Sequence, residues 1–290
     1  MATEIYYFSG TGNSLYVARE LKKRIPDLRL IPIVALLNER TKERNKSIKS
    51  IAETIGFVFP CHGLTIPIPV KKFLKYLDLT SSEYLFAIAT RGGSIFHGFS
   101  AIDKILNKQG KKLDASIVIN MGMNDPKLKS FSVPTSEDLK EIELRVQEKL
   151  DIIQNCIINH KSYHDSTSGV TFSHFSPFNY ILERLVPFTV HHVAPKVKKY
   201  FYADSKCTGC GTCEKVCLSR KITMANERPI WQNNIECYMC YTCLNYCPAQ
   251  SIQIYSKFYM KSFTEEKGRY PHPYAQVKDI IIQKSNPSTP

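Results

Sequence analysis

The sequence predicts an α/β protein: a doubly wound, five-stranded parallel sheet, followed by a small α+β module rich in cysteine. Two observations carry this prediction. The first 160 residues alternate continuous apolar runs with amphipathic stretches, which is typical of parallel strands covered by helices on both faces. Eight of the ten cysteines then fall between Cys207 and Cys247.

The expected strands are short apolar runs bounded by polar or turn residues. They occupy 5–8, 28–34, 54–59, 84–90 and 115–120. Amphipathic stretches at 14–25, 70–77, 95–109 and 136–159 alternate with several of them and predict helices. We place a first domain at 1–160, a connector with some helix at 161–199, the cysteine module at 200–257 and a tail without regular period at 258–290.

Composition narrows the class of protein. A chain of 290 residues with 43% apolar residues can bury a real core. No apolar run approaches the ~20 residues that span a bilayer, and the N-terminus has no charged segment followed by an apolar core. Clustered cysteines in a chain without a secretion signal favour metal ligands over disulfides, and we expect a cytoplasmic protein.

The formal charge of +13 is spread along the chain, for example over 19–24, 39–49, 108–112 and 196–200. No nucleic-acid-binding motif accompanies it, so we expect no nucleic-acid partner. Two interpretations stay open. The charge is a solvated surface, or it attracts an acidic protein partner.

The cysteines form two runs, "CTGCGTCEKVC" and "CYMCYTCLNYC", related by a constant shift of thirty residues. The shift extends beyond the cysteines, since Phe201 corresponds to Trp231 and Ile222 to Ile252. Each half therefore predicts an aromatic strand, a ligand loop, a short helix and a return strand.

The spacing C-x2-C-x2-C-x3-C is typical of bacterial ferredoxins with two [4Fe–4S] clusters, in which the fourth cysteine of a run binds the other cluster. Zinc sites also use paired C-x2-C, but zinc binding does not explain why each run has a third cysteine and a fourth one after three further residues. Leu218 stands where the pattern has proline, as Pro248 does in the second run. The expected ligand sets are Cys207, Cys210, Cys213 and Cys247 for one cluster, and Cys237, Cys240, Cys243 and Cys217 for the other.

A glycine-rich loop joins the first expected strand to the first expected helix, so its N–H groups and the helix dipole favour an anion. A Walker loop would need Gly-Lys-Ser/Thr, and a dinucleotide fingerprint would need glycine where Leu15 stands. An ordinary βα turn is the remaining alternative. The loop, "SGTGNS", resembles the FMN phosphate loop of flavodoxin-like domains. Its residues are Ser9, Gly10, Thr11, Gly12, Asn13 and Ser14.

Similarity to flavodoxins implies that two further loops hold the flavin ring. They follow the third and fourth expected strands. His62 and His97 flank this expected site and could deliver protons, while Cys61 is either a redox partner of the flavin or a buried packing residue. The implied residues are Pro60, Cys61, His62 and Gly63 in one loop, and Thr90, Arg91, Gly92 and Gly93 in the other.

The whole arrangement resembles the EFR1-type ferredoxin family, in which a flavodoxin-like domain is fused to a two-cluster ferredoxin. The phrase "KGRYPHPY" (267–274) adds to this resemblance. It implies a flavodoxin-like domain with FMN and a module with two [4Fe–4S] clusters. A flavin exchanges two electrons and each cluster one, so this pairing of cofactors predicts an electron carrier, and the clusters suit an oxygen-poor metabolism. No nicotinamide-binding fingerprint is present, so we expect electrons to be exchanged with another redox protein, such as an acidic ferredoxin or flavodoxin. Two alternatives remain: a flavin-dependent reductase of a small organic substrate fed by the clusters, and a non-catalytic redox sensor.

Overall fold

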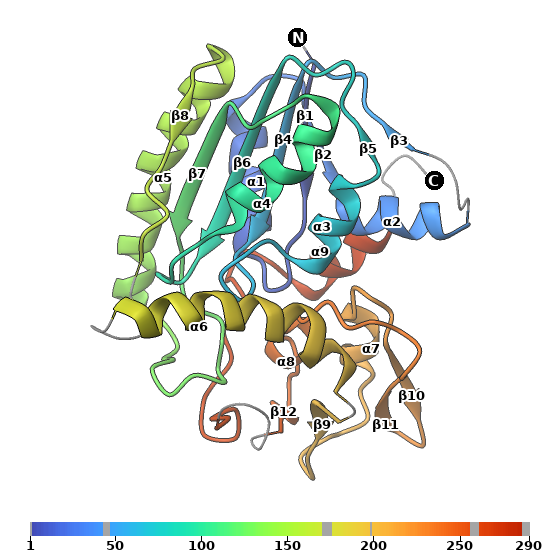
Figure 1. Cartoon of the computed structure of the whole chain (residues 1–290). Coiled ribbons are helices and arrows are strands. Elements are labelled where there is room, and N and C mark those ends of the chain that lie inside the picture. Colours follow the sequence, from blue (N-terminus) through green and yellow to red (C-terminus); the bar gives the residue numbers. More distant parts are fainter. Residues whose placement is uncertain (1, 43–46, 170–175, 198, 256–260, 286–290) are drawn as a thin grey trace.

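A six-stranded, wholly parallel sheet forms the larger part of the computed structural model, which describes residues 2–42, 47–169, 176–197, 199–255 and 261–285 (Figure 1). Its strand order is β2-β1-β4-β6-β7-β8. The strands are β1 (Thr3–Tyr7), β2 (Leu28–Pro32), β4 (Thr54–Pro60), β6 (Tyr84–Arg91), β7 (Ala115–Asn120) and β8 (Tyr163–His164).

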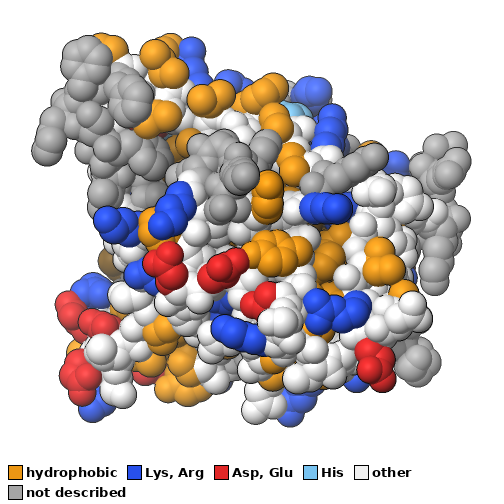
Figure 2. Space-filling view, turned by 90° about the horizontal axis from the view of Figure 1, so that it is seen from below, with side chains coloured by type: hydrophobic (Ala, Val, Ile, Leu, Met, Phe, Trp, Pro, Cys, Tyr) orange, Lys and Arg blue, Asp and Glu red, His pale blue; other side chains and the backbone are white. Residues whose placement is uncertain are grey.

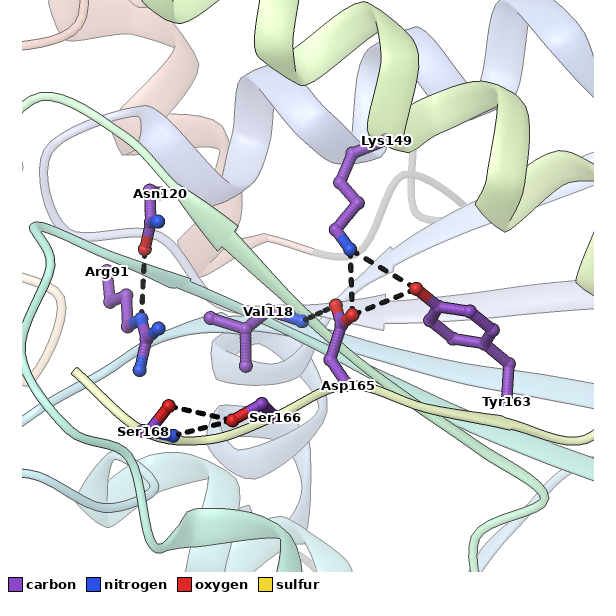
Figure 3. A network of polar contacts seen from close by, with 8 residues as sticks. All are labelled: Arg91, Val118, Asn120, Lys149, Tyr163, Asp165, Ser166 and Ser168. Atoms are coloured by element: carbon purple, nitrogen blue, oxygen red, sulfur yellow. Dashed lines mark hydrogen bonds and ion pairs between the residues drawn. The ribbon is translucent and has the colours of Figure 1, made fainter.

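Five of these strands confirm the five predicted ones, and the sixth was missed. Strand β8 has only two residues and no apolar run, so it carries no pattern of its own. Side chains hold this edge in place (Figure 3). Asp165 accepts from the Val118 N–H at 3.0 Å, from the Tyr163 hydroxyl at 3.0 Å, and pairs with Lys149 at 2.7 Å.

Helices cover both faces of the sheet, as expected for a doubly wound fold. Alternate strand residues face opposite layers: Ile5 and Tyr7 pack with α1 (Asn13–Arg24) and α5 (Ser136–Ile158). Tyr6 and Phe8 belong to the opposite core. That core is covered by α2 (Ile33–Lys42), α3 (Ile68–Leu74) and α4 (Gly98–Leu106).

Helix α2 corrects the sequence analysis. The apolar run 28–34 was predicted as one strand, but β2 ends at Pro32 and α2 begins at Ile33. Proline lacks an N–H and fixes its own φ, which suits the end of a strand next to a helix start. The run is therefore shared by two elements.

The order of the first five strands matches the flavodoxin type of doubly wound sheet. The chain moves from β1 to one side at β2, then crosses to the other side at β4. Between β1 and β4 the direction of winding reverses, and the loops after their carboxyl ends diverge. A crevice for a ligand is expected at this point.

The cysteine module has the predicted repeat and lies below the carboxyl end of the sheet in Figure 1. Its outer strands pair antiparallel, β9 with β12, and so do β10 and β11. The elements are β9 (Phe201–Ala203), α7 (Thr212–Val216), β10 (Ile222–Ala225), β11 (Arg228–Trp231), α8 (Thr242–Asn245) and β12 (Ile252–Ile254).

Helix α6 (Ser176–Phe188) lies between sheet and module in Figure 1 and continues as a π-helix, Thr189–Val193. The tail is more regular than predicted: it holds α9 (Val277–Ile281) and a 3-10 turn, Ile282–Lys284. The boundary expected at 257–258 lies outside the described residues. Within the described part of the chain, every helix is too short or too polar to span a membrane. Smaller elements are β3 (Ile48–Lys49), β5 (Leu77–Asp78) and the 3-10 turns Asn107–Gln109 and Ala194–Lys196.

Candidate functional site

A cavity of about 260 Å³ opens at the carboxyl end of the sheet. Its walls come from the loops after β1, β4, β6 and β7, from α6 with its π-helical continuation, and from the second cysteine run. This is where doubly wound sheets hold ligands. Of the residues expected to hold a flavin, it is lined by Gly10, Thr11, Pro60, Cys61, His62, Gly63 and Gly92.

The other expected flavin residues do not line this cavity, and several are used for local packing. The Ser14 and Thr90 hydroxyls lie 2.8 Å apart and pair with each other. Arg91 turns toward the sheet edge, where its Nε donates to Asn120 at 2.9 Å (Figure 3) and its guanidinium also donates to the Thr167 carbonyl at 3.0 Å. The remaining members of this group are Ser9, Gly12, Asn13 and Gly93.

The glycine-rich loop is nevertheless built like an anion site. It leads into α1, whose first N–H groups have no partner within the helix. Gly12, the residue before α1, has φ of 105°, which only glycine adopts without strain. The Ser9 hydroxyl accepts from the Gly12 N–H at 3.1 Å, and the Thr11 hydroxyl pairs with Asn124.

The sequence analysis missed several lining residues, among them Leu64, Ser94, Leu128, Val186, Val190, Met239 and Tyr241. Three more, Met123, Asn124 and Asp125, form a group of their own. They follow β7, so the only available signal was that every loop at the carboxyl end of a parallel sheet meets the same crevice. Burial raises the pKa of Asp125 to about 6, although Lys127 nearby opposes this shift. A carboxyl group at this edge therefore exchanges protons close to neutral pH.

Of the two histidines expected to flank the flavin site, only His62 lines the cavity, and Cys61 lines it as well. His62 lines the cavity, and burial lowers its pKa to about 3, so its imidazole is neutral. Its Nδ1 is buried and unpartnered among the described residues. His97 instead pairs with Glu183 on α6 at 3.0 Å. Burial raises the pKa of Cys61 to about 11, which keeps it a thiol.

The first cysteine set surrounds a small cavity of its own. Burial, with the neighbouring thiols of this set, raises the pKa of Cys213 to about 11. Cys210 is exposed, so this cavity reaches the surface. The four cysteines on its wall are Cys207, Cys210, Cys213 and Cys247.

The second set surrounds another cavity, which lies deeper. Burial and the neighbouring sulfurs raise the pKa of Cys243 well above its usual value. Four thiols gathered around one cavity suit a metal centre that binds them as thiolates. The four cysteines on this wall are Cys217, Cys237, Cys240 and Cys243, so each cavity takes one cysteine from the other run.

The sulfurs are arranged around cavities. Among the described residues, no three His, Cys, Asp or Glu side chains converge on a point that would hold a single metal ion.

The two ligand loops share an unusual backbone. Gly209 and Gly211 have φ of 71°, and the residues thirty positions later, Met239 and Tyr241, also adopt positive φ, 52° and 56°. A left-handed conformation costs a residue with a side chain about 1 kcal/mol or more. The second run accepts this cost at both positions, and both side chains line the cavity at the end of the sheet.

The second cysteine cavity and the sheet-end cavity share a wall, because Cys240 and Tyr241 line both. Gly10 approaches so closely that a Cβ atom there would overlap the Cys240 carbonyl oxygen. The loop after β1 and the second ligand loop are therefore in direct van der Waals contact.

Residues 206–252 match the family model of the 4Fe-4S dicluster domain. No curated protein matches the chain. Among solved structures, it is similar to rubredoxin oxygen:oxidoreductase from the anaerobe Desulfovibrio gigas, at 16% identity and a TM-score of 0.31, over 53% of this chain and 36% of that one. It is also similar to the metal-soaked Flv1 flavodiiron core from Synechocystis sp. PCC6803, at 15% identity and a TM-score of 0.29, over 54% and 36%. The chain thus spans about a third of the length of either structure.

The family match and the two cysteine cavities together indicate iron–sulfur chemistry in the C-terminal part of the chain. The sheet topology adds a flavodoxin-like fold. A redox function follows from the combination.

Proposed function

We propose that this protein is an electron-transfer iron–sulfur flavoprotein that holds FMN and two [4Fe–4S] clusters and exchanges electrons with an external redox protein. FMN exchanges two electrons and each cluster one, so the bound set would supply a two-electron to one-electron adaptor. One observation carries the proposal: Cys240 and Tyr241 line both the sheet-end cavity, where the flavin would bind, and the second cysteine cavity.

The residues around the sheet-end cavity fit FMN. Gly10 and Thr11, next to the N-terminus of α1, would hold its phosphate. Neither a lysine nor a second phosphate-binding loop is among the residues that line this cavity, which fits the single phosphate of FMN. The loops at Pro60–Leu64 and Gly92–Ser94 would hold the ring. His62, which stays neutral, and Asp125 both line this cavity, and Asp125 is placed to accept or return a proton.

The cluster of the second cysteine set would exchange electrons with the flavin, and the cluster of the first set would exchange them with the external partner. Cys240 stands beside the flavin cavity, whereas Cys210 is exposed and offers a partner access to the first set. Cys217 and Cys247 each belong to one run and line the cavity of the other set, so both runs contribute to each set. We propose the domain limits 1–160 for the flavodoxin-like part, to which the edge strand β8 at Tyr163–His164 is added, and 200–257 for the ferredoxin-like part.

The test is anaerobic reconstitution with a count of iron, sulfide and flavin. We expect about eight irons per chain and one FMN. Cys217→Ala should damage mainly the cluster bound by Cys237, Cys240 and Cys243. Thr11→Asp should weaken FMN by placing negative charge against its phosphate. Zinc, FAD, or no more than half the expected iron after full reconstitution would contradict the proposal.

A reductase of a small organic substrate is a second candidate, favoured by one observation. Asp125 combines a pKa of about 6 with a place on the cavity wall, which suits a proton donor to a reduced substrate. Turnover of an organic acceptor that falls in Asp125→Asn, with cofactor content unchanged, would support the reductase over the carrier.

A further inference from the structure

The hydroxyl of Thr242 touches both sites. It lies 2.8 Å from the carbonyl oxygen of Gly10 in the loop after β1, and 3.0 Å from the sulfur of Cys240. Thr242 begins α8 and is fully buried. A hydroxyl carries one proton, so it donates to only one of these acceptors at a time.

The internal repeat supplies a natural comparison. Thr212 stands thirty residues earlier, at the equivalent first position of α7, and its hydroxyl lies 3.4 Å from the sulfur of Cys210. Cys210 lines the first cysteine cavity and faces the surface, whereas Cys240 lines the sheet-end cavity. Both threonines can bond a ligand sulfur, and Thr242 adds the contact with Gly10.

We propose that Thr242 is a positioning residue that couples the phosphate end of the flavin site to the second cluster. This rests on the proposed function. The carbonyl of Gly10 and the sulfur of Cys240 compete for the same hydroxyl proton.

The competition has a direction. A hydrogen bond to a ligand sulfur favours the more negative, reduced form of an iron–sulfur centre and raises its reduction potential. Greater charge on the Cys240 sulfur therefore draws the Thr242 proton away from Gly10. Linkage is reciprocal, so any state of the loop that holds the proton at Gly10 withdraws it from the sulfur.

The test uses the full chain reconstituted with clusters and FMN. Thr242→Val keeps the shape but removes the hydroxyl, Thr242→Ser keeps the hydroxyl, and Thr212→Val is the matched control. Two quantities are measured: the midpoint potential of each cluster, by a dithionite titration followed by electron paramagnetic resonance, and the dissociation constant of FMN with oxidised clusters.

Thr242→Val should lower the potential of the second cluster and weaken FMN by roughly fivefold or more. Thr212→Val should lower only the potential of the first cluster, with FMN affinity within about twofold of the starting protein. Thr242→Ser should restore both quantities. Iron content and circular dichroism identify a variant that does not fold, and Thr242→Ala, which introduces no new methyl contact, then takes the place of the valine variant.

The proposal is overturned if the protein binds FMN and both clusters, yet Thr242→Val leaves FMN affinity unchanged or changes it no more than Thr212→Val does. A starting protein that holds both clusters but no FMN would instead overturn the proposed function, and the coupling with it. These two results are distinguished by the flavin count alone.

Discussion

Gly10 is a glycine because of what lies opposite it. Its φ is not in the left-handed region, so its backbone conformation does not require glycine. What requires it is the Cys240 carbonyl, which occupies the space a Cβ atom would need. This residue of the glycine-rich loop thus also permits the second ligand loop to approach.

Gly10→Ala should separate the two loops. We expect the free energy of unfolding to fall by about 1–3 kcal/mol through overpacking, and FMN and second-cluster content to fall together. Gly110→Ala is the control, since Gly110 has positive φ in a surface turn with open space around it. That variant should lose some stability from backbone strain but retain both cofactors. Equal cofactor retention in the two variants would refute the role of the contact.

Asp125 makes stability depend on pH in a stated direction. Its pKa is raised to about 6 from an ordinary value near 4. The folded chain therefore binds this proton more tightly than the unfolded chain, and stability falls as pH rises from about 4 to about 6. Asp125→Asn removes this loss, although the attraction between Asp125 and Lys127 is lost with it.

We expect Asp125→Asn to raise the free energy of unfolding by about 1 kcal/mol at pH 7.5 and to change it little at pH 4. Denaturant unfolding at both pH values checks this. The exposed Asp151 gives the control variant, Asp151→Asn, which should show no such difference between the two pH values. A gain for Asp125→Asn that is equal at both pH values would contradict the assignment.

At the scale of elements, the apolar periodicity of the sequence predicted the long strands and helices and missed the short ones. The five strands and helices α1, α3, α4 and α5 each carry a clear apolar pattern. Strand β8 has two residues held by Asp165 and Lys149, and α2 begins inside an apolar run that reads as strand. Of the site, cysteine spacing predicted the two sets that the structure brings together, whereas Asn124 and Asp125 carry no motif. Local patterns do not encode which distant loops meet.

The ligand loops show how one backbone serves two purposes. Met239 and Tyr241 occupy left-handed positions that the first run fills with glycine. Their side chains form part of the sheet-end cavity wall. Glycine at these two positions would avoid the backbone strain, but it has no side chain with which to form this wall.

Tyr241→Gly should relieve backbone strain by about 1 kcal/mol but remove part of the flavin wall. We expect FMN to dissociate faster while both clusters remain. Gln250→Gly is the matched control, because Gln250 also has positive φ, 49°, but is exposed and lines neither cavity. The rate of flavin release is measured by stopped flow, and the iron content shows whether both clusters remain. Unchanged release in Tyr241→Gly would show that the side chain is dispensable.

At the scale of the whole molecule, the charge is large but dispersed. In the view from below (Figure 2), lysine and arginine side chains are interspersed with acidic and hydrophobic ones, and the described residues of that face form no continuous basic patch. We therefore look for steering of an acidic partner in particular residues close in sequence to the exposed Cys210. Lys206 and Lys215 are such residues, and both are exposed.

Lys206→Glu should slow electron transfer from an acidic ferredoxin, with cofactor content unchanged. The difference should be largest at low salt, because the Debye length falls to about 10 Å at 0.1 M and screens exposed charges. Lys108→Glu, on the sheet part of the chain, is the control. Stopped-flow rates over a range of salt concentrations test this, and a flat salt profile with a competent acidic partner would remove the role.

Residues of the tail hydrogen-bond to the glycine-rich loop, which lies far from them in the sequence. The Gln283 side chain accepts from the Ser9 N–H at 3.0 Å and donates to the Ser9 carbonyl at 2.9 Å, and the His272 N–H donates to the Thr11 carbonyl at 2.7 Å. Gln283 follows Ser9 by 274 residues. At a synthesis rate of 5–20 residues per second, roughly 15 to 60 seconds separate them on the ribosome.

The nascent chain therefore exposes its earliest loop long before the residues that complete it exist. We expect the flavin to be acquired only after residues 272–283 have left the ribosome, when they and the second ligand loop can both reach the glycine-rich loop. Chains stalled on the ribosome before His272 should emerge without bound FMN, while the released full chain takes it up. Flavin carried by the stalled chains would show that the first loop matures on its own.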